Sequence, residues 1–385
     1  MDYIPYGRQS ISEDDINAVV EVLKSDFLTQ GPVVTQFEEG IKNYTGAQYC
    51  LAVNSATSAL HIACLAMNLG AEDTLWTSPI SFVASSNCAL YCGARVDFVD
   101  IDSKTYNICP NQLEDKLKKT NKPPKIVVPV HLAGTSCDME ALAFLADKYG
   151  FYLLEDSSHA IGAEFKGSRA GSCAFSDASV FSFHPVKIIT TGEGGAITTN
   201  NAELYEKMLM LRSHGITRER RFMHEDHGLW YYEQQALGFN YRITDFQCAL
   251  GYSQLLRLNS FIEARRALAE KYNNCLKNLP LVIPYQPAYQ KSAYHLYIIK
   301  VKNRAEVFHY LREQQIGVNV HYIPIHTQPY YQQLGFKKGD FPVAEQYYAE
   351  ALSLPMYPAL QEEEFFHVIH NLEQVLQSQT CEVNA

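Results

Sequence analysis

The sequence predicts an α/β protein, with a large domain built on a mostly parallel central sheet and a small α+β C-terminal domain. Two observations predict this class. Between residues 49 and 199, short β-rich runs alternate with segments of helical length, which is typical of βα units and of a parallel sheet covered on both faces. After Asn240, apolar residues recur at helical spacing over about thirty residues, long enough to link two domains.

The elements can be placed in order along the chain. Ser12 to Asp15 (SEDD) predict the capped start of a short helix. Beyond the long helical segment lie YHLYIIKV, a helix around AEVFHYLREQQ, VNVHYIP and two further helices. We therefore expect a large domain over 1–255 and a small one over 256–385. The strand-like runs of the large domain are YCLAV, TLWTS, VDFVD, KIVVPV, FYLLE, ASVFSF and AITT.

Composition excludes several classes of protein. The 385 residues are 47% hydrophobic and 19% charged without a long apolar run, so we expect a globular protein and no membrane span. The first residues contain no apolar signal segment, which favours the cytoplasm. A net charge of −10 opposes nucleic-acid binding. The ten cysteines are scattered, and the closest pair, Cys88 and Cys92, lacks a zinc or redox spacing, so neither a metal site nor a disulfide framework is expected.

Candidate binding residues follow the strand-like runs, where ligands of parallel sheets bind. NSATSAL, residues 54–60, combines small residues with hydroxyls at a helix start, as a phosphate-binding turn requires. An ordinary helix cap needs the same residue types. Asp156, after FYLLE, either caps a helix or pairs with a protonated ring nitrogen of a ligand. His159 alone is more typical of a packed histidine than of a base. Phe82 either stacks on a flat ring or belongs to the core.

Lys187 lies in SFHPVKIITTGEGG, residues 182–195. Desolvation by Phe183, Val186 and Ile188 would lower the pKa of its amine and favour a nucleophile that forms a Schiff base. The alternative is a lysine that extends from a strand end into solvent. Ser182 could offer a second phosphate contact. A lysine, a carboxylate, an aromatic face and a phosphate-binding turn together match the aldehyde, ring nitrogen, ring and phosphate of pyridoxal phosphate.

With these residues in place, the chain resembles the DegT/DnrJ/StrS sugar aminotransferases, which are fold-type I pyridoxal-phosphate enzymes related in fold to aspartate aminotransferase. The motifs that carry the resemblance are LTQGP, NSATSALH, SPISFVAS, VDFVDID, PVHLAG, EDSSHA, SFHPVKIITTGEGG, RSHG, NYRITDFQCALG and VHYIPIHTQPYY. They run nearly from end to end.

The resemblance implies a role for each candidate. Lys187 would form the Schiff base and shuttle protons, Asp156 would pair with the ring nitrogen, and His159 would support Asp156. Further implied cofactor contacts are Phe82 on the ring and Ala56, Thr57 and Ser182 on the phosphate. Asn240 would reach the cofactor of a neighbouring subunit, which implies a homodimer with shared active sites. The implied nucleotide-sugar contacts are Gln30, Arg242, His321 and Tyr322. No metal is implied.

The resemblance also implies a reaction. L-Glutamate would supply an amino group to C4 of a UDP-4-keto-6-deoxy-N-acetylhexosamine, UDP-2-acetamido-2,6-dideoxy-β-L-arabino-hexos-4-ulose, with pyridoxamine phosphate formed between the two half-reactions. This step serves pseudaminic acid biosynthesis and flagellin glycosylation. The alternatives are a D-configured UDP- or dTDP-4-keto sugar as acceptor, or a non-catalytic regulator that binds a nucleotide sugar. Sugar dehydratases of the family replace the lysine by histidine, so Lys187 argues against them. Ala133, where many members have an aromatic residue, is expected to enlarge the pocket floor.

Overall fold

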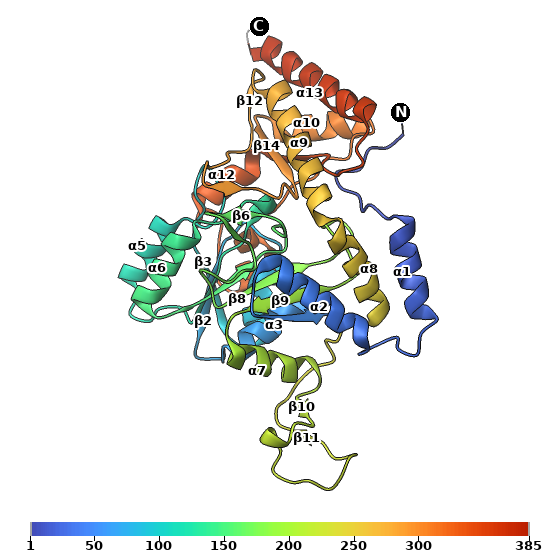
Figure 1. Cartoon of the computed structure of the whole chain (residues 1–385). Helices are drawn as coiled ribbons and strands as arrows, with labels where there is room; N and C mark the ends of the chain where they lie inside the picture. The colour runs from blue at the N-terminus through green and yellow to red at the C-terminus, as the bar shows by residue number, and fades with distance from the viewer. Residues whose placement is uncertain (1, 384–385) are drawn as a thin grey trace.

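The computed structural model describes the backbone of residues 2–383 and the side chains of residues 2–378. A seven-stranded sheet forms the centre of its larger part (Figure 1). β9 runs antiparallel to both of its neighbours, and the other neighbouring strands in the sheet are parallel, as predicted. In sheet order the strands are β1 (Tyr49–Val53), β9 (Gly195–Thr199), β8 (Ala178–Ser182), β5 (Tyr152–Asp156), β4 (Ile126–Val128), β2 (Thr74–Thr77) and β3 (Arg95–Phe98).

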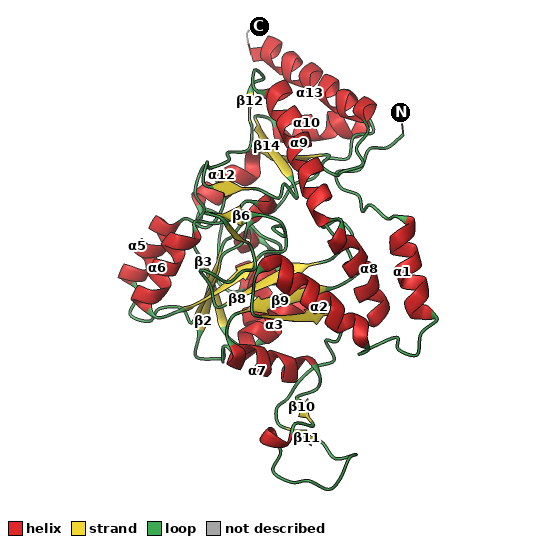
Figure 2. Cartoon of the chain, viewed as in Figure 1, coloured by secondary structure: helices red, strands yellow, loops and turns green. Residues whose placement is uncertain are grey.

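Helices cover both faces of this sheet (Figure 2). Successive side chains of β1 point to opposite faces of the sheet. Leu51 and Val53 pack in the apolar core on one face, whereas Cys50 and Ala52 pack in the core on the other. Because both faces of the sheet are buried, the sequence of each strand is a nearly continuous run of apolar residues. The helices of this part are α1 (Glu13–Leu23), α2 (Pro32–Thr45), α3 (Ala56–Ala66), α4 (Ala84–Tyr91), α5 (Pro110–Lys119), α6 (Met139–Tyr149), α7 (Ala202–Arg212) and α8 (Asp245–Leu256).

The predicted cap of the first helix is confirmed. The backbone N–H of Asp15 donates to Ser12 Oγ, and the backbone N–H of Ser12 donates to Asp15 Oδ2. Asp15 is fully buried where α1 packs on α8, and it also accepts a hydrogen bond from Gln254 Nε2 of α8 at 2.7 Å (Figure 1). The long helical segment predicted after Asn240 is two helices, α8 and α9 (Leu258–Leu276), which meet at Arg257.

The C-terminal part forms a second, antiparallel sheet with its own apolar core. Ile4 from the N-terminal segment packs in that core and pairs with Ile316. None of the described helices combines the length and apolar character that a bilayer span needs. The elements of this part are β12 (Leu281–Val282), β14 (Tyr297–Val301), α10 (Arg304–Glu313), α11 (Pro329–Gln333), α12 (Pro342–Glu350), β15 (Ala351–Leu354) and α13 (Glu362–Val383).

An arm formed by residues 213–240 projects from the large part, beyond α7 (Figure 1). It contains β10 (Ile216–Thr217) and β11 (Glu233–Gln234), and its apolar residues Leu229 and Trp230 are exposed. The remaining short elements are β6 (Glu164–Phe165), β7 (Ser168–Arg169), β13 (Gln290–Lys291) and the 3₁₀ turns Leu132–Gly134, Arg220–Phe222 and Ile325–Thr327.

Candidate active site

A cavity of about 530 Å³ lies at the carboxyl ends of β5 and β8, where the large sheet meets residues 319–322. This is a normal size for a cofactor or small-molecule site. The predicted site residues that line it are Ala56, Thr57, Phe82, Asp156, His159, Ser182, Lys187, His321 and Tyr322. The fold thus brings together residues that are far apart in the sequence.

The N-terminus of α3 opens into the cavity. Ser55 caps this helix, and its Oγ accepts a hydrogen bond from the backbone N–H of Ser58 at 3.1 Å. The first-turn N–H groups of Ala56 and Thr57 have no intrahelical partner and are available to an anion. A Cβ atom on Gly195 would lie 2.6 Å from the nitrogen of Ala56, so only glycine allows β9 to approach this turn. Ser182 pairs with Gly195 and lies at the same end of the sheet.

Asp156 ends β5 in the wall of the cavity and is 5% exposed. Its Oδ2 accepts a hydrogen bond from Ser85 Oγ at 2.6 Å, and its Oδ1 accepts one from the backbone N–H of Ser158 at 3.1 Å. Ser85 Oγ lies 2.6 Å from Ser81 Oγ in turn. These bonds hold the carboxylate in one orientation and leave further lone pairs for a donor in the cavity.

Lys187 lies on the turn between β8 and β9 and faces the same cavity. Burial lowers the pKa of its amine to about 8, although the negative charge of Asp156 acts in the opposite direction. The pKa of Lys187 is thus shifted downward, as the apolar residues around it in the sequence predicted. Of the apolar neighbours named beforehand, Val186 lines the cavity, whereas Phe183 and Ile188 are buried in the core beneath it.

His159 contacts Tyr322 and not the carboxylate of Asp156. The backbone N–H of Ala133 donates to His159 Nδ1 at 3.3 Å, so the proton of a neutral ring lies on Nε2, which is 3.0 Å from Tyr322 Oη. Burial, and then the positive charge of Lys187, hold the pKa of His159 well below its ordinary value, which keeps the ring neutral. The phenol proton of Tyr322 is then available to a ligand. The support of Asp156 that was assigned to His159 comes instead from Ser85 and Ser158.

Phe82 and His321 both lie close to Tyr322. The ring centroid of Phe82 is 6.3 Å from that of Tyr322, and Phe82 is 60% exposed, so its face is open to a flat ligand. His321 Nδ1 lies 2.8 Å from Ser353 Oγ, and burial lowers the pKa of this ring to about 3.

Three predicted site residues do not line this cavity. Gln30 and Arg242 line a separate pocket of about 240 Å³, together with Glu38 and Arg212. Arg212 Nη1 donates to Glu38 Oε1 at 2.8 Å in that pocket. Asn240 is exposed, and its carbonyl oxygen lies 3.4 Å from Asn54 Nδ2.

The family of the chain can now be stated. The sequence pattern of the DegT/DnrJ/EryC1/StrS aminotransferase family matches residues 9–373. The chain belongs to this family. The spore coat polysaccharide biosynthesis protein SpsC of Bacillus subtilis is 37% identical to it over 97% of each sequence. The UDP-4-amino-4,6-dideoxy-N-acetyl-β-L-altrosamine transaminase of Campylobacter jejuni is 39% identical over 92% of each sequence.

Solved structures of aminotransferases share the whole fold. PseC of Helicobacter pylori, an aminotransferase of pseudaminic acid biosynthesis, is 34% identical, with a TM-score of 0.90 over 98% of this chain and all of that chain. The putative sugar aminotransferase Spr1654 of Streptococcus pneumoniae is 27% identical. Its pyridoxamine-phosphate form has a TM-score of 0.91 over 97% of this chain and 99% of that chain. Its pyridoxal-phosphate form has a TM-score of 0.90 over 98% of this chain and 99% of that chain.

The chain is therefore a pyridoxal-phosphate-dependent sugar aminotransferase. Its own residues fit the cofactor: the α3 N-terminus offers N–H groups to a phosphate, and a lysine and a carboxylate face the same cavity. No group of three or more residues suited to hold a metal ion occurs in the described part of the chain.

Sequence reasoning missed several residues of the cavity. Behind the cavity wall, Ser85, which bonds to Asp156, could have been found, because it lies in the first turn of α4, four residues after Ser81, and the two Oγ atoms are 2.6 Å apart. His295 gave no local signal, because it comes from a distant segment; its ring packs against that of His159 at a tilt of 40°, with centroids 4.4 Å apart. Further lining residues that were not predicted include Tyr6, His184, Glu193 and Asn319.

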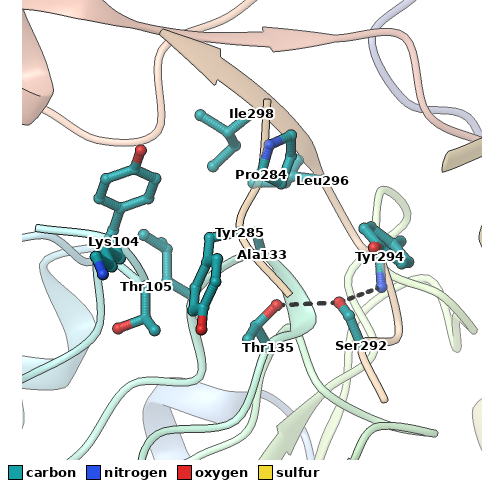
Figure 3. Close-up of a pocket in the computed structure, with 12 residues that line it drawn as sticks. Lys104, Thr105, Ala133, Thr135, Pro284, Tyr285, Ser292, Tyr294, Leu296 and Ile298 are labelled. Carbon is teal, nitrogen blue, oxygen red and sulfur yellow. Dashed lines mark hydrogen bonds between the residues drawn. The ribbon is translucent and has the colours of Figure 1, made fainter. Parts of the chain in front are cut away.

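Ala133 does not form the floor of the large cavity as expected. It lines a small cavity of about 30 Å³ instead (Figure 3), and only its backbone N–H bonds to His159. Thr135 Oγ1 donates to Ser292 Oγ in its wall, and Ser292 Oγ accepts from the backbone N–H of Tyr294. The small side chain at 133 therefore adds no room at the active site.

Replacement of Ser85 by alanine should lower kcat by about one to two powers of ten and leave the KM for the amino donor unchanged. The variant removes one hydrogen bond to a charged carboxylate, which is worth about 1.5–3 kcal/mol. Steady-state kinetics would measure this, with Ser86→Ala as the control, because Ser86 bonds to Tyr331 and not to Asp156. Equal kcat values for the two variants would contradict the role given to Ser85.

Combination of the apoprotein with pyridoxal phosphate should depend on pH with a midpoint near 8. The pKa of Lys187 is lowered to about 8, so the reactive neutral amine gains about tenfold per pH unit below 8 and levels off above it. Stopped-flow absorbance from pH 6.5 to 9.5 would follow the rate. A rate that still rises steeply above pH 9 would indicate an ordinary lysine.

Proposed function

We propose that this chain transfers the amino group of L-glutamate to C4 of UDP-2-acetamido-2,6-dideoxy-β-L-arabino-hexos-4-ulose, in the cytoplasm, as a step of pseudaminic acid biosynthesis that serves flagellin glycosylation. The observation that carries the proposal is the single cavity in which Lys187, Asp156 and the α3 N-terminus meet. Two relatives support the substrate, because the Campylobacter jejuni transaminase and PseC carry this activity or pathway in their names.

The residues of the cavity would act as follows. When bound, pyridoxal phosphate supplies an aldehyde that exchanges amino groups and a ring that withdraws electrons. Asp156 holds a proton on the ring nitrogen by opposing it with a negative charge. The neutral amine of Lys187 takes a proton from Cα of the amino donor and returns one at the cofactor carbon. Phe82 covers one face of the ring, and Ser182 joins the α3 N–H groups on the phosphate.

His159 and Tyr322 would serve the sugar. A neutral His159 donates from Nε2 to Tyr322 Oη, and the phenol then donates its own proton toward the oxygen of the sugar ketone. Burial and nearby charge raise the pKa of Tyr322 far above its ordinary value, so the phenol remains a hydrogen-bond donor at neutral pH. His321 lies beside it in the wall of the cavity.

We further propose a homodimer with shared active sites. Asn240 is exposed and does not line the cavity of its own chain, and Gln30 and Arg242 lie in the second pocket. In the dimer, Asn240 of the partner subunit reaches the cofactor phosphate, and the partner's Arg242 adds positive charge for the diphosphate of the nucleotide sugar. Such a local charge is needed because the chain carries a net charge of −10.

Mixed dimers test this sharing. Lys187→Ala and Asn240→Ala should each be nearly inactive, yet subunits exchanged between the two should regain about a quarter of wild-type activity. Half of the random dimers are mixed, and one of their two sites combines an intact Lys187 with an intact Asn240. Activity assayed after denaturation and refolding of the mixture would measure this. No recovery would mean that Asn240 serves its own chain.

The substrate is tested by a side-by-side assay. The L-arabino UDP-4-keto sugar, its D-configured epimer and a dTDP-4-keto sugar are each supplied with L-glutamate, and 2-oxoglutarate is measured. The proposal predicts the highest kcat/KM for the L-arabino sugar. The alternative is another 4-keto nucleotide sugar, which the similarity to SpsC, a protein of spore coat polysaccharide biosynthesis, favours. Preference for either other sugar would establish that alternative.

A further inference from the structure

One histidine in the wall of the active-site cavity has an imidazole without a hydrogen-bond partner. The ring of His295 lines the cavity and packs against the ring of His159, and the residue is 4% exposed. Neither of its ring nitrogens hydrogen-bonds with the part of the chain that the structure describes. A buried polar group that stays unpaired costs free energy. A ligand that pairs with this ring would remove that cost.

The two ring nitrogens of His295 differ in their surroundings. Nδ1 is enclosed by protein atoms and Nε2 is not, so Nε2 is the nitrogen that a molecule in the cavity can reach. Enclosed N–H groups without an acceptor are rare in proteins, and enclosed acceptors without a donor are less so. Burial holds the pKa of His295 well below its ordinary value, so the ring is neutral. We therefore place its one proton on Nε2, which makes His295 a hydrogen-bond donor toward the cavity.

The other histidines of the cavity wall are engaged within the chain. Each of them forms at least one side-chain hydrogen bond there, and they are His159, His184 and His321. Among the described residues that line the cavity, His295 is the one histidine whose ring is held only by packing. Its donor is thus free for a substrate.

A buried arginine lies next to the backbone of His295. Arg265, on α9, is 1% exposed, and its Nη1 donates to the carbonyl oxygens of Tyr294, His295 and Met356 at 3.2, 3.3 and 2.9 Å. Burial lowers the pKa of Arg265 to about 10, so the guanidinium is still charged at neutral pH. Its hydrogen bonds to described residues all go to carbonyl oxygens and not to a carboxylate. A buried charge without an opposite partner favours an anion nearby.

The amino donor is such an anion, and the cavity offers few other groups to hold it. Of the described residues that line it, none is an arginine, and Lys187 is the one lysine, whose proposed partner is the cofactor. The carboxylates in the wall are Asp156, assigned to the ring nitrogen, and Glu193, which is exposed. The Nε2–H of His295 is therefore well suited to receive a carboxylate.

We propose that His295 binds a carboxylate of the amino donor through Nε2 and that Arg265 adds fixed positive charge to this subsite. The ligand class is a dicarboxylic amino acid, and this rests on the proposed function, in which L-glutamate is the donor. His295 binds and moves no proton. The acceptor sugar carries no carboxylate, so the second half-reaction should not need His295.

Binding of glutarate to the holoenzyme tests the subsite. Glutarate has the two carboxylates of glutamate but no amino group, so it binds without reacting, and titration calorimetry measures its Kd. His295→Leu loses a hydrogen bond to a charged group and should weaken binding by about one to two powers of ten. His295→Gln keeps an N–H donor close to the position of Nε2 and should stay within about threefold of the wild type.

The two half-reactions separate donor binding from a general loss of structure. Stopped-flow absorbance of the bound cofactor follows the reaction with L-glutamate and the return with the 4-keto sugar. His295→Leu should raise the glutamate concentration for half-maximal rate at least about tenfold and leave that for the sugar unchanged. His326→Gln is the control and should change neither, because His326 is fully buried but pairs with Glu345 outside the cavity.

Three results would overturn the proposal: unchanged glutarate affinity in folded His295→Leu, an equal loss in His295→Gln, or an equal loss for the sugar. Near-UV circular dichroism checks that the variants are folded. Wild-type protein whose glutarate binding depends on residue 295 in this way, but which does not aminate the sugar, would contradict the proposed acceptor and support this subsite.

Discussion

The Lys187→Ala variant should lose at least about 10³-fold in turnover while it still binds pyridoxal phosphate. Proton transfer by a positioned side chain contributes about 10²–10⁴-fold, and the variant also loses the amine that bonds to the cofactor. The phosphate-binding turn at Ser55, Ala56 and Thr57 is untouched, so the cofactor should remain bound without a covalent link. Turnover and cofactor retention after gel filtration would measure both effects.

A second variant separates charge from nucleophilicity at this position. Lys187→Arg keeps a positive charge of similar reach, but a guanidinium is always protonated and cannot act as the amine does. It should be as inactive as Lys187→Ala. Near-normal turnover in either variant would show that Lys187 is not the catalytic amine.

The Asp156→Asn variant should lose between two and four powers of ten in kcat and keep its fold. Loss of one partner of a buried ion pair costs about 3–5 kcal/mol, and that cost slows turnover by this factor if it falls on the transition state. The amide oxygen can still accept the hydrogen bond from the Ser158 N–H, and the amide NH2 can donate to Ser85 Oγ, whose hydroxyl can turn, so the end of β5 should be undisturbed. Steady-state kinetics and thermal unfolding would measure the two quantities.

The control for this prediction is another buried acid of the same strand. Glu155 lies next to Asp156 but pairs with His131, at 2.8 Å, on the opposite side of β5 and away from the cavity. A loss of stability without a specific loss of kcat is expected for Glu155→Gln. If Asp156→Asn retained near-wild-type turnover, the carboxylate would not be the partner of the ring nitrogen.

The sequence predicted most of the fold, because its strong signals are local. The capping residues of α1 and the alternation of apolar runs with helical segments depend on neighbours in the chain, and both were confirmed. The antiparallel course of β9 was not predicted, since nothing in AITT distinguishes it from its parallel neighbours. The break at Arg257 was also missed, because the apolar spacing continues across it.

The candidate site was predictable where each residue follows a strand. Asp156 and Ser182 lie at the ends of β5 and β8, and Lys187 follows β8 closely, so their convergence comes from the parallel sheet itself. The partners of His159 could not be predicted, because Ala133 and Tyr322 approach it from separate segments. The separation of Gln30 and Arg242 from the cavity likewise depends on tertiary packing that no local pattern carries.

The central claim is a covalent bond between the amine of Lys187 and the cofactor, and borohydride reduction with peptide mapping tests it most directly. Reduction makes the bond permanent, and trypsin does not cleave after a modified lysine. We predict a single phosphopyridoxyl adduct on Lys187, in a peptide that spans residues 170–207. An adduct on another lysine, with residues 170–187 released as an unmodified peptide, would contradict the account.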